Sequence, residues 1–423
     1  GLRFGPREMR LYPNGRLAAH ILGGASFGRE GVHSAEVIGV AGVEKTFDER
    51  LRKPSISVDP LKLSIDLSVQ AAVESVLGSG MSLLNAKGAA AILMNINNGE
   101  IISLASLPDF DPNHRPKLPS TGDPANSPLF NRAIQGVYEL GSTFKIFAIA
   151  QALELKIVSP ETMINVSGPL RWGKFKIRDF HNYGSELPVK KVISKSSNIG
   201  TARIAQEIGS IEQQKFLKSL GLFDIVPLEM VEASGGKPLL PKNWSELSTM
   251  TISYGHGLSA TPLHLAAAYA AIGNGGYKVT PTLQIQENQK YGDRVISEAV
   301  SKQALSMLRS VVTDGTATMA EVPGYPVAGK TGTADKPSPT GRYYDDKVIT
   351  NFAALFPAGD PKYVLVVTMD EPEDTTGEEA RRTAGWTAVP VAAEIITRIA
   401  PLLGLRPENN QDPLFKVLPA KMN

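Results

Sequence analysis

The chain has 423 residues, and its 42% hydrophobic and 20% charged residues are the balance of a globular protein with a full core. Its formal net charge is +2 and no run of lysine and arginine stands out, so the charge gives no support for nucleic-acid binding. It contains no cysteine, which excludes disulfides, thiolate metal sites and a cysteine nucleophile. No uninterrupted apolar stretch reaches the roughly 18 residues of a membrane-spanning helix, and the N-terminus lacks a signal-peptide pattern.

The first part of the chain changes character near residue 60. Residues 1 to about 56 combine glycine, arginine and short apolar pairs without a sustained period, which predicts a small module of short strands and loops. Arg52-Lys53-Pro54 and the Ser-Val-Asp-Pro that ends at residue 60 are typical of a linker. The next segment predicts a helix over 69–83, then strands over 89–96 and 101–105 that are joined by a hairpin turn at Asn97-Asn98-Gly99.

The remaining elements place helices between two groups of strands. A loop rich in proline, asparagine and aspartate is predicted over 108–128, followed by a helix from Ser142 to about Leu155. Short helices and Pro/Gly turns continue to about Asn274. The last third predicts an amphipathic closing helix over 389–400, preceded by strands over 327–334, 348–356 and 363–370. Strands at both ends with helices between them indicate an α+β fold whose sheet is assembled from distant segments.

The first of three motifs that can carry chemistry is Ser142-Thr143-Phe144-Lys145, at the start of a predicted helix. Residues three apart share a helical face, so the hydroxyl and the amine can meet. A serine hydroxyl becomes a nucleophile when a base takes its proton. A lysine is such a base when a helix N-terminus in a buried, cation-rich site depresses its pKa. Alone, this short motif arises often by chance, and a solvent-facing lysine is the simpler interpretation.

The second motif is Ser196-Ser197-Asn198. A Ser-x-Asn can place a hydroxyl and an amide on one wall of a cleft, where the hydroxyl relays protons and the amide binds a peptide carbonyl. Taken alone, a turn or a helix cap is the more common role for these residue types. The motif therefore gains its weight from the other two.

The third motif is Lys330-Thr331-Gly332-Thr333, inside a predicted strand. Strand alternation puts Lys330 and Gly332 on one side and the two threonines on the other. The glycine leaves room for another extended chain, the threonine hydroxyls can hold a terminal carboxylate, and the lysine adds positive charge to the cleft. A strand with a bulge is the alternative interpretation for this motif alone.

The three motifs occur in this order, with about fifty and then about a hundred and thirty residues between them. Their combination is the signature of penicillin-binding proteins and serine β-lactamases. The chain resembles the class B penicillin-binding proteins, and Asn198 is similar to the division type, because the elongation type usually has an acidic residue there. The resemblance covers nearly the whole chain and includes Arg10–Gly15, Ala18–Gly23, Gly42–Glu44, Phe47-Asp48, Ser64–Asp66, Gln70, Tyr254–Gly257, Thr261-Pro262 and Gly273–Gly276.

The resemblance implies a three-layer α/β/α transpeptidase domain with a central antiparallel sheet and a small mixed pedestal module before it. We expect the remnant of a pedestal (dimerisation-type) module and its linker over 1–58, the transpeptidase domain over 59–405, and a C-terminal tail over 406–423. Family members begin with a cytoplasmic tail and one transmembrane anchor, neither of which this sequence contains. The expected location is therefore the periplasmic side of the bacterial inner membrane, with a polytopic glycosyltransferase and other division proteins as partners and no nucleic acid.

The resemblance also implies the chemistry of single residues. The nucleophile would be acylated by a peptidoglycan stem peptide that ends in D-alanyl-D-alanine, and β-lactams would trap the same acyl state. The backbone N–H groups of Ser142 and Thr333 would form the oxyanion hole, and no cofactor or metal is expected. The expected site residues are the catalytic Ser142, Lys145, Ser196, Asn198 and Lys330, and the substrate-binding Thr331, Gly332 and Thr333.

Other functions share parts of this pattern. A β-lactamase or D,D-carboxypeptidase would differ in letting water reach the acyl-enzyme, and a β-lactam sensor would acylate once and signal without turnover. Glu161 and Asn165 have the spacing of a class A β-lactamase loop but precede the second motif. Residues 255–260 fit the loose dinucleotide fingerprint without a convincing strand before them or an acidic residue at the right distance. The six histidines show no metal-binding spacing.

Overall fold

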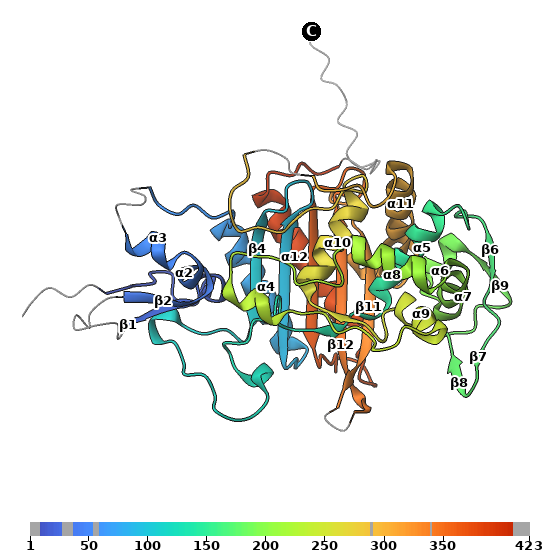
Figure 1. The fold of residues 1–423 in the computed structure, drawn as a ribbon, viewed down its shortest axis with the longest axis horizontal. Helices are drawn as coiled ribbons and strands as arrows, with labels where there is room; N and C mark the ends of the chain where they lie inside the picture. The colour runs from blue at the N-terminus through green and yellow to red at the C-terminus, as the bar shows by residue number, and fades with distance from the viewer. Residues whose placement is uncertain (1–8, 28–36, 54–58, 288–290, 339–340, 409–423) are drawn as a thin grey trace, which may run out of the picture.

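The computed structural model describes residues 9–27, 37–53, 59–287, 291–338 and 341–408 (Figure 1). At its centre is a five-stranded sheet in the order β11–β12–β13–β3–β4, in which every neighbouring pair is antiparallel. Its strands are β3 (Gly88–Asn95), β4 (Ile101–Leu107), β11 (Ala328–Pro337), β12 (Tyr343–Phe356) and β13 (Tyr363–Asp370). Because β13 pairs with β3, early and late segments share one sheet, and the predicted α+β fold is confirmed.

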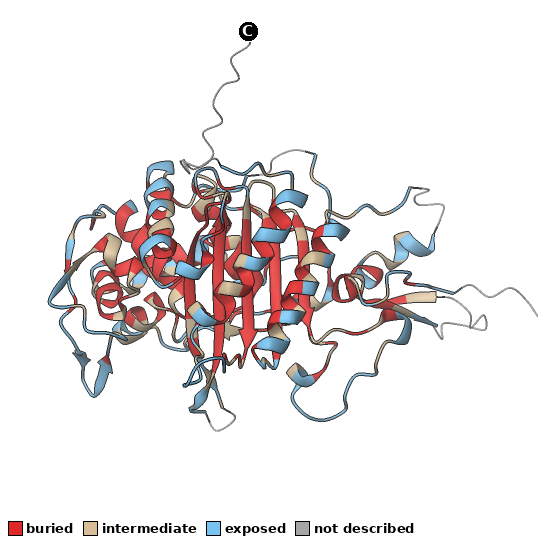
Figure 2. Ribbon diagram, turned by 180° about the vertical axis from the view of Figure 1, so that it is seen from behind, coloured by how far each residue is buried: buried red, intermediate tan, exposed pale blue. Residues whose placement is uncertain are grey.

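Helices cover both faces of this sheet. On one face α4 (Leu67–Leu83) packs beside α12 (Ala388–Leu402), and on the other α10 (Pro262–Gly273) lies beside α11 (Glu298–Asp314). Seen from the side of α4 and α12, the outward parts of these helices are exposed and the parts next to the strands are buried (Figure 2). In β3 all residues but the last are buried, as expected for a strand covered on both faces. Burial of apolar side chains therefore holds three layers together.

The elements predicted from sequence periodicity are present within a few residues of their expected bounds. The predicted helix over 69–83 is α4, and the predicted strands on either side of Asn97-Asn98-Gly99 are β3 and β4. Gly99 has a φ of +77°, the left-handed conformation that suits glycine in a tight turn. The three predicted late strands are β11, β12 and β13, and the closing helix is α12. Strong, regular hydrophobic patterns thus located the sheet and its outer helices.

A helical region lies at one end of the sheet (Figure 1). It contains α5 (Lys145–Glu154), α6 (Val189–Ser194), α7 (Asn198–Ile208), α8 (Ser210–Ser219) and α9 (Glu246–Ser253). The sequence predicted helices and turns here but missed two short antiparallel pairs. These are β6 (Met163–Asn165) with β9 (Glu186–Pro188), and β7 (Leu170–Trp172) with β8 (Phe175–Ile177). Each has three residues per strand and is largely exposed, so no hydrophobic alternation marks it.

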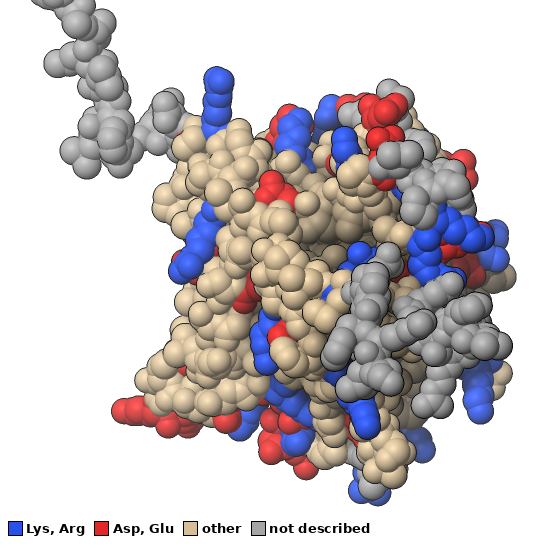
Figure 3. Space-filling view, turned by 90° about the vertical axis from the view of Figure 1, so that its left-hand side faces the viewer, with Lys and Arg blue, Asp and Glu red and all other residues tan. Residues whose placement is uncertain are grey.

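The N-terminal residues form a small module at the other end (Figure 1). It consists of α1 (Ala19–Leu22), the antiparallel pair β1 (Gly24–Phe27) and β2 (Val37–Ala41), α2 (Gly42–Thr46) and α3 (Asp48–Arg52). The short strands were predicted, whereas the three helices of four or five residues were not. Seen from this end, Lys/Arg and Asp/Glu side chains are interspersed on the surface (Figure 3).

Hydrogen bonds join this module to the larger domain. Glu74 of α4 accepts from the backbone N–H of Ala18 at 2.9 Å, and Asn113 accepts from the N–H of Tyr12 at 2.9 Å. The division of the chain at residues 58 and 405 remains a prediction. Part of the predicted linker, residues 54–58, and the tail beyond residue 408 lie outside the described residues.

Short elements complete the fold. They are the pair β5 (Tyr138–Glu139) with β10 (Ser259–Ala260), and the 3₁₀ helices η1 (Pro112–His114), η2 (Pro124–Asn126), η3 (Gly141–Phe144), η4 (Val231–Gly235), η5 (Thr318–Ala320) and η6 (Ala384–Trp386). Among the residues that the structure describes, no helix combines the length and apolar character needed to cross a membrane.

Candidate active site

Ser142 and Lys145 meet at the start of the helical region. Ser142 lies in η3, and Lys145 is the first residue of α5, so the predicted helix begins with a tighter 3₁₀ turn. The Lys145 Nζ donates to Ser142 Oγ at 2.5 Å. The lysine side chain is completely buried, although a lysine is normally exposed. The spacing of three residues therefore brings hydroxyl and amine together, as predicted.

The second motif reaches the same lysine from a different segment. Ser196 and Asn198 lie at the junction of α6 and α7, and their side-chain oxygens accept from Lys145 Nζ at 3.0 and 2.7 Å. Ser196 has a φ of +62°, a left-handed conformation that is uncommon for a residue with a side chain. This turn points both side chains of the motif toward Lys145.

The third motif closes the group. Lys330 lies in β11, at the edge of the five-stranded sheet, and its Nζ donates to Ser196 Oγ at 3.0 Å and to the Thr331 carbonyl at 3.1 Å. Like Lys145, it is completely buried. The Ser196 hydroxyl thus lies between the side-chain amines of two lysines, one from α5 and one from β11.

Burial of two cations in contact with one hydroxyl lowers their pKa values. The pKa of Lys145 lies well below its usual value, first because burial penalises the charged form and second because Lys330 is positive. The charge of Asp179 opposes this shift. Burial alone lowers the pKa of Lys330 to about 7. The neutral form of Lys145 is therefore more accessible than that of an exposed lysine, and it is placed to take the proton of Ser142.

The threonines of the third motif have neighbours that hold them. Thr331 Oγ1 lies 2.6 Å from Thr316 Oγ1, and Thr333 Oγ1 accepts from the N–H of Ala384 at 3.0 Å. Thr331 is buried and Thr333 is half-buried. Both hydroxyls are thus fixed in orientation, which is what binding of a terminal carboxylate would require.

Gly332 has a packing role that the sequence did not predict. A Cβ at this position would lie 2.3 Å from the Leu140 carbonyl oxygen and 2.9 Å from Thr143 Cγ2. Glycine is therefore required because β11 passes directly against the turn that carries Ser142. The expected room for another extended chain beside the strand stays a prediction.

Asp179 is a residue of the site that the sequence reasoning missed. Its carboxylate accepts from Ser197 Oγ at 2.7 Å and from the N–H of Ile199 at 2.9 Å. Ser197 in turn caps α7 by accepting from the N–H of Gly200. Asp179 thereby holds the turn that presents Ser196 and Asn198. It precedes the motif by almost twenty residues, so no local sequence pattern connects the two.

The glycine-rich segment 255–260 also belongs to this region. Gly255 has a φ of +89°, and a Cβ there would lie 1.9 Å from the Gly141 carbonyl oxygen. The segment follows helix α9, so it lacks the preceding strand that a dinucleotide-binding turn needs. Its glycine lets the chain pack against the residue before Ser142.

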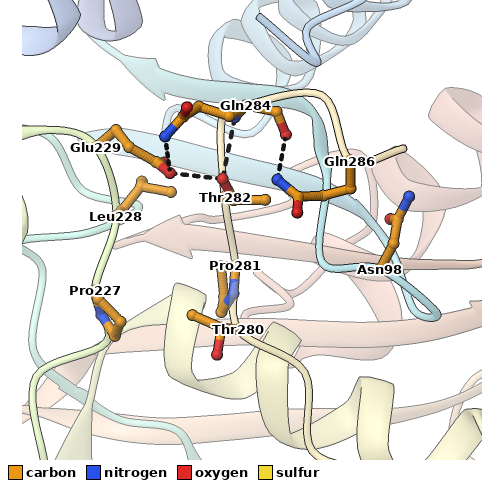
Figure 4. Close-up of a pocket in the computed structure, with 9 residues that line it drawn as sticks. All are labelled: Asn98, Pro227, Leu228, Glu229, Thr280, Pro281, Thr282, Gln284 and Gln286. Carbon is orange, nitrogen blue, oxygen red and sulfur yellow. Dashed lines mark hydrogen bonds between the residues drawn. The ribbon is translucent and has the colours of Figure 1, made fainter. Parts of the chain in front are cut away.

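A recess of about 380 Å³ lies between Leu228 and Thr280 but contains none of the motif residues (Figure 4). Glu229 points into its wall and accepts from Thr282 Oγ1 at 2.6 Å and from Gln284 Nε2 at 3.1 Å. Its carboxylate also accepts from the N–H of Leu283 at 2.8 Å. These polar groups form hydrogen bonds with one another and join the segment 280–286 to the domain. Their role in holding the fold together accounts for them without a ligand.

The cleft is that of a serine acyl-transferase, and comparisons with known proteins identify the family. Residues 89–397 match the family described as "Penicillin binding protein transpeptidase domain". The "Probable peptidoglycan D,D-transpeptidase FtsI" of Caulobacter vibrioides is 34% identical, over 96% of this chain and 68% of that protein. The Escherichia coli "Peptidoglycan D,D-transpeptidase FtsI" is 30% identical, over 96% of this chain and 70% of its own length.

Solved structures agree. The transpeptidase domain of Burkholderia pseudomallei penicillin-binding protein 3 superposes with a TM-score of 0.71 at 31% identity, covering 82% of this chain and 98% of that one. Penicillin-binding protein 3 of Mycobacterium, in complex with aztreonam, gives a TM-score of 0.79 at 26% identity, covering 95% and 91%. The chain belongs to the penicillin-binding protein transpeptidase family, and the resemblance to its class B, division-type members is confirmed.

Proposed function

We propose that this chain is a peptidoglycan D,D-transpeptidase that cross-links stem peptides during septal wall synthesis through an acyl-enzyme on Ser142. The observation that carries the proposal is the 2.5 Å contact between Ser142 Oγ and the completely buried Lys145 Nζ. A lysine with a depressed pKa at that position supplies the base that a serine nucleophile needs.

The acylation step follows from these contacts. Neutral Lys145 takes the proton of Ser142 as its Oγ attacks the carbonyl carbon of the penultimate D-alanine. The backbone N–H groups of Ser142 and Thr333 would stabilise the oxyanion, an interaction of the kind that is typically worth roughly 3–4 kcal/mol. When the C–N bond breaks, the proton passes from Lys145 through Ser196 to the leaving D-alanine amine. Ser196 is suited to this relay because it contacts both lysines.

Binding of the donor peptide uses β11. This strand forms an edge of the five-stranded sheet, so an extended peptide can lie antiparallel beside it. Thr331 and Thr333 would bind the terminal carboxylate, with Lys330 as the nearby positive charge. Asn198 would hold the amide of the donor. Its own Nδ2 is oriented by a 3.0 Å hydrogen bond to the Arg178 carbonyl.

The second half of the reaction transfers the acyl group to an amine of a neighbouring stem peptide, whose nitrogen replaces Ser142 Oγ at the carbonyl carbon. A β-lactam resembles the same dipeptide and leaves a slowly released acyl group on Ser142. We propose the periplasmic side of the bacterial inner membrane as the location. A polytopic glycosyltransferase and other division proteins are the proposed partners.

The test is mass spectrometry of the intact protein during hours of incubation with a penicillin. A stable adduct on Ser142, absent from Ser142→Ala, is the expected result, and turnover of a thioester donor with an acceptor amine separates the enzyme from a single-use sensor. Rapid return to the unmodified mass with hydrolysed drug would reassign the chain as a β-lactamase. Undiminished labelling of Ser142→Ala would refute the assignment of the nucleophile.

A further inference from the structure

The hairpin formed by β7 and β8 projects from the helical region, at the opposite end of the molecule from β1 and β2 (Figure 1). Its two strands pair with each other and form a separate two-stranded sheet. Almost all of its residues are exposed, and Ile177 and the half-buried Leu170 anchor it in a small hydrophobic cluster with Ile199 and Met250. The hairpin therefore adds little to the hydrophobic core, and core packing does not explain the residue types on its exposed surface.

The hairpin carries positive charge only. Arg171, Lys174, Lys176 and Arg178 are exposed, and no acidic residue occurs between Glu161 and Asp179. Within the described residues, none of these four cations forms an ion pair. This differs from the N-terminal end of the molecule, where both signs of charge are mixed (Figure 3). A run of unpaired cations on a projecting element favours an anionic partner.

Aromatic rings lie among these cations. Trp172 is 37% exposed, Phe175 50% and Phe180 82%. The Lys174 Nζ lies 5.6 Å from the centre of the Phe175 ring. Exposed flat rings beside cations present apolar faces and charged donors together, which suits a ligand that has both rings and carboxylates.

The base of the hairpin is attached to the active site. The carbonyl of Arg178, the residue that follows β8, accepts from Asn198 Nδ2, and Asn198 also contacts Lys145. A recess of about 320 Å³ lies at this point, lined among others by Pro169, Arg178, Phe180 and Tyr183. A polymer bound along the hairpin would therefore have one of its ends close to the active-site residues.

We propose that the β7–β8 hairpin and the recess at its base bind the glycan–peptide chain of uncross-linked peptidoglycan, and hold it beside the active site. The cations would contact the carboxylates of the stem peptides, and the aromatic rings would stack on the sugars. This inference rests on the proposed transpeptidase function. An anionic lipid surface fits less well. The hairpin lies at the opposite end of the molecule from the N-terminal module, and family members carry their membrane anchor before that module (Figure 1).

The test is sedimentation of the chain with purified peptidoglycan at low salt. The hairpin variant carries Arg171→Gln, Lys174→Gln and Lys176→Gln. The matched control carries Lys53→Gln, Lys215→Gln and Lys302→Gln, which change the net charge equally at exposed ion pairs elsewhere. We expect the hairpin variant to bind roughly tenfold more weakly than the control, because it loses several salt-screened attractions at one place. A second variant, Trp172→Ala with Phe175→Ala, removes stacking contacts, which salt does not screen. It should therefore bind peptidoglycan more weakly than the wild-type chain at both low and high salt.

The outcomes separate this inference from the proposed function. Labelling of Ser142 by penicillin in the same preparations shows whether each variant is folded and tests the acyl-enzyme independently. Equal sedimentation of hairpin and control variants would overturn the inference, as would failure of the wild-type chain to bind peptidoglycan. Preferential binding to vesicles of anionic phospholipid, lost in the hairpin variant, would assign the surface to a membrane instead.

Discussion

Two pairs of lysines in this molecule have different surroundings: Lys336 and Lys347 are partly exposed, whereas Lys145 and Lys330 are completely buried. At one end of the sheet, Lys336 lies 2.5 Å from a carboxylate oxygen of Asp370 and 2.7 Å from one of Glu371, and Lys347 lies 2.9 Å from the other oxygen of Glu371. In the catalytic cleft, Lys145 and Lys330 contact hydroxyl, amide and carbonyl oxygens. Among the described residues, neither of them has a carboxylate within ion-pair distance.

The two surroundings have opposite electrostatic effects. The hydrogen bond and charge of Glu371 raise the pKa of Lys347. Burial without a paired carboxylate lowers the pKa of Lys330 to about 7 and that of Lys145 well below its usual value. A carboxylate partner favours the charged form of a lysine, whereas burial without such a partner favours the neutral form. Complete burial and the lack of a carboxylate partner together make Lys145 and Lys330 reactive groups, whereas Lys336 and Lys347 are nearer the surface and paired.

Removal of the proposed base should have the largest effect. Lys145→Met keeps the volume of the side chain but cannot accept the Ser142 proton, so we expect acylation by penicillin to slow by roughly 10²–10⁴-fold. Stopped-flow measurement of the acylation rate constant checks this. Lys302→Met, on the exposed face of α11, is the control and should acylate at the wild-type rate. Acylation of Lys145→Met within a factor of two of wild type would mean that another group takes the proton.

The same substitution at the two kinds of lysine should change stability in opposite directions. Lys336→Met leaves the buried Asp370 carboxylate without its closest cation and should lower the free energy of unfolding by about 3 kcal/mol. Lys330→Met removes a buried cation that has no paired carboxylate, and should raise the free energy of unfolding at pH 7 by about 1–3 kcal/mol. Chemical denaturation measures the free energy of unfolding of both variants. Changes of the same sign in the two variants would contradict the predicted difference between paired and unpaired lysines.

The stability gain of Lys330→Met should depend on pH. The folded-state pKa is about 7 against the usual 10.5, so the unfolded chain binds more protons between these two values. The free energy of unfolding contributed by Lys330 therefore rises with pH across this window. We expect the difference between Lys330→Met and wild type to be largest below pH 7 and to shrink toward pH 10.5. A constant difference from pH 6 to pH 9 would show that Lys330 titrates normally.

The acylation rate itself should follow a bell-shaped pH profile. It should rise as Lys145 loses its proton, and fall above about pH 7 as Lys330 loses the charge that attracts the substrate carboxylate. The second-order rate constant of acylation, measured at several pH values, reports the free enzyme. A rate that keeps rising to pH 9 would exclude a charged Lys330 from the reaction.

The smallest effect should come from Asp179, whose charge opposes the lowering of the Lys145 pKa. Asp179→Asn keeps the size of the side chain but removes the charge, so the pKa of Lys145 falls further. The acid limb of the acylation profile should then move to lower pH by a fraction of a unit. Asp314→Asn, exposed on the end of α11, should leave the limb in place. A shift toward higher pH would show that Asp179 acts on Lys145 only through the shape of the turn.

The sequence predicted those parts of the site that depend on local geometry. Ser142 and Lys145 meet because three residues make one helical turn, and Lys330 lies in a segment that was predicted as a strand. The order of three motifs then identified the family, although each was weak alone. The sheet was predicted for the same reason, since β3, β12 and β13 are long, regular and buried.

Features that depend on contacts between distant segments could not be predicted in this way. Asp179 acts on a turn almost twenty residues away, and Thr316 reaches Thr331 from beyond α11. The need for glycine at position 332 comes from Leu140, which precedes it by almost two hundred residues. The hairpin of β7 and β8 was missed because its short strands are held by a few contacts and present polar and aromatic residues to solvent.

The close passage of backbone around Ser142 also limits how this protein can respond to drug selection. Gly332 and Gly255 each bring another segment within contact of the turn that carries the nucleophile, and any larger residue would push that turn aside. A substitution at either position would displace the nucleophile, and the proposed acylation by a stem peptide would be lost together with that by a β-lactam. Heritable drug tolerance should therefore arise from substitutions outside these crossings, where the shape of the entrance can change while the nucleophile stays in place.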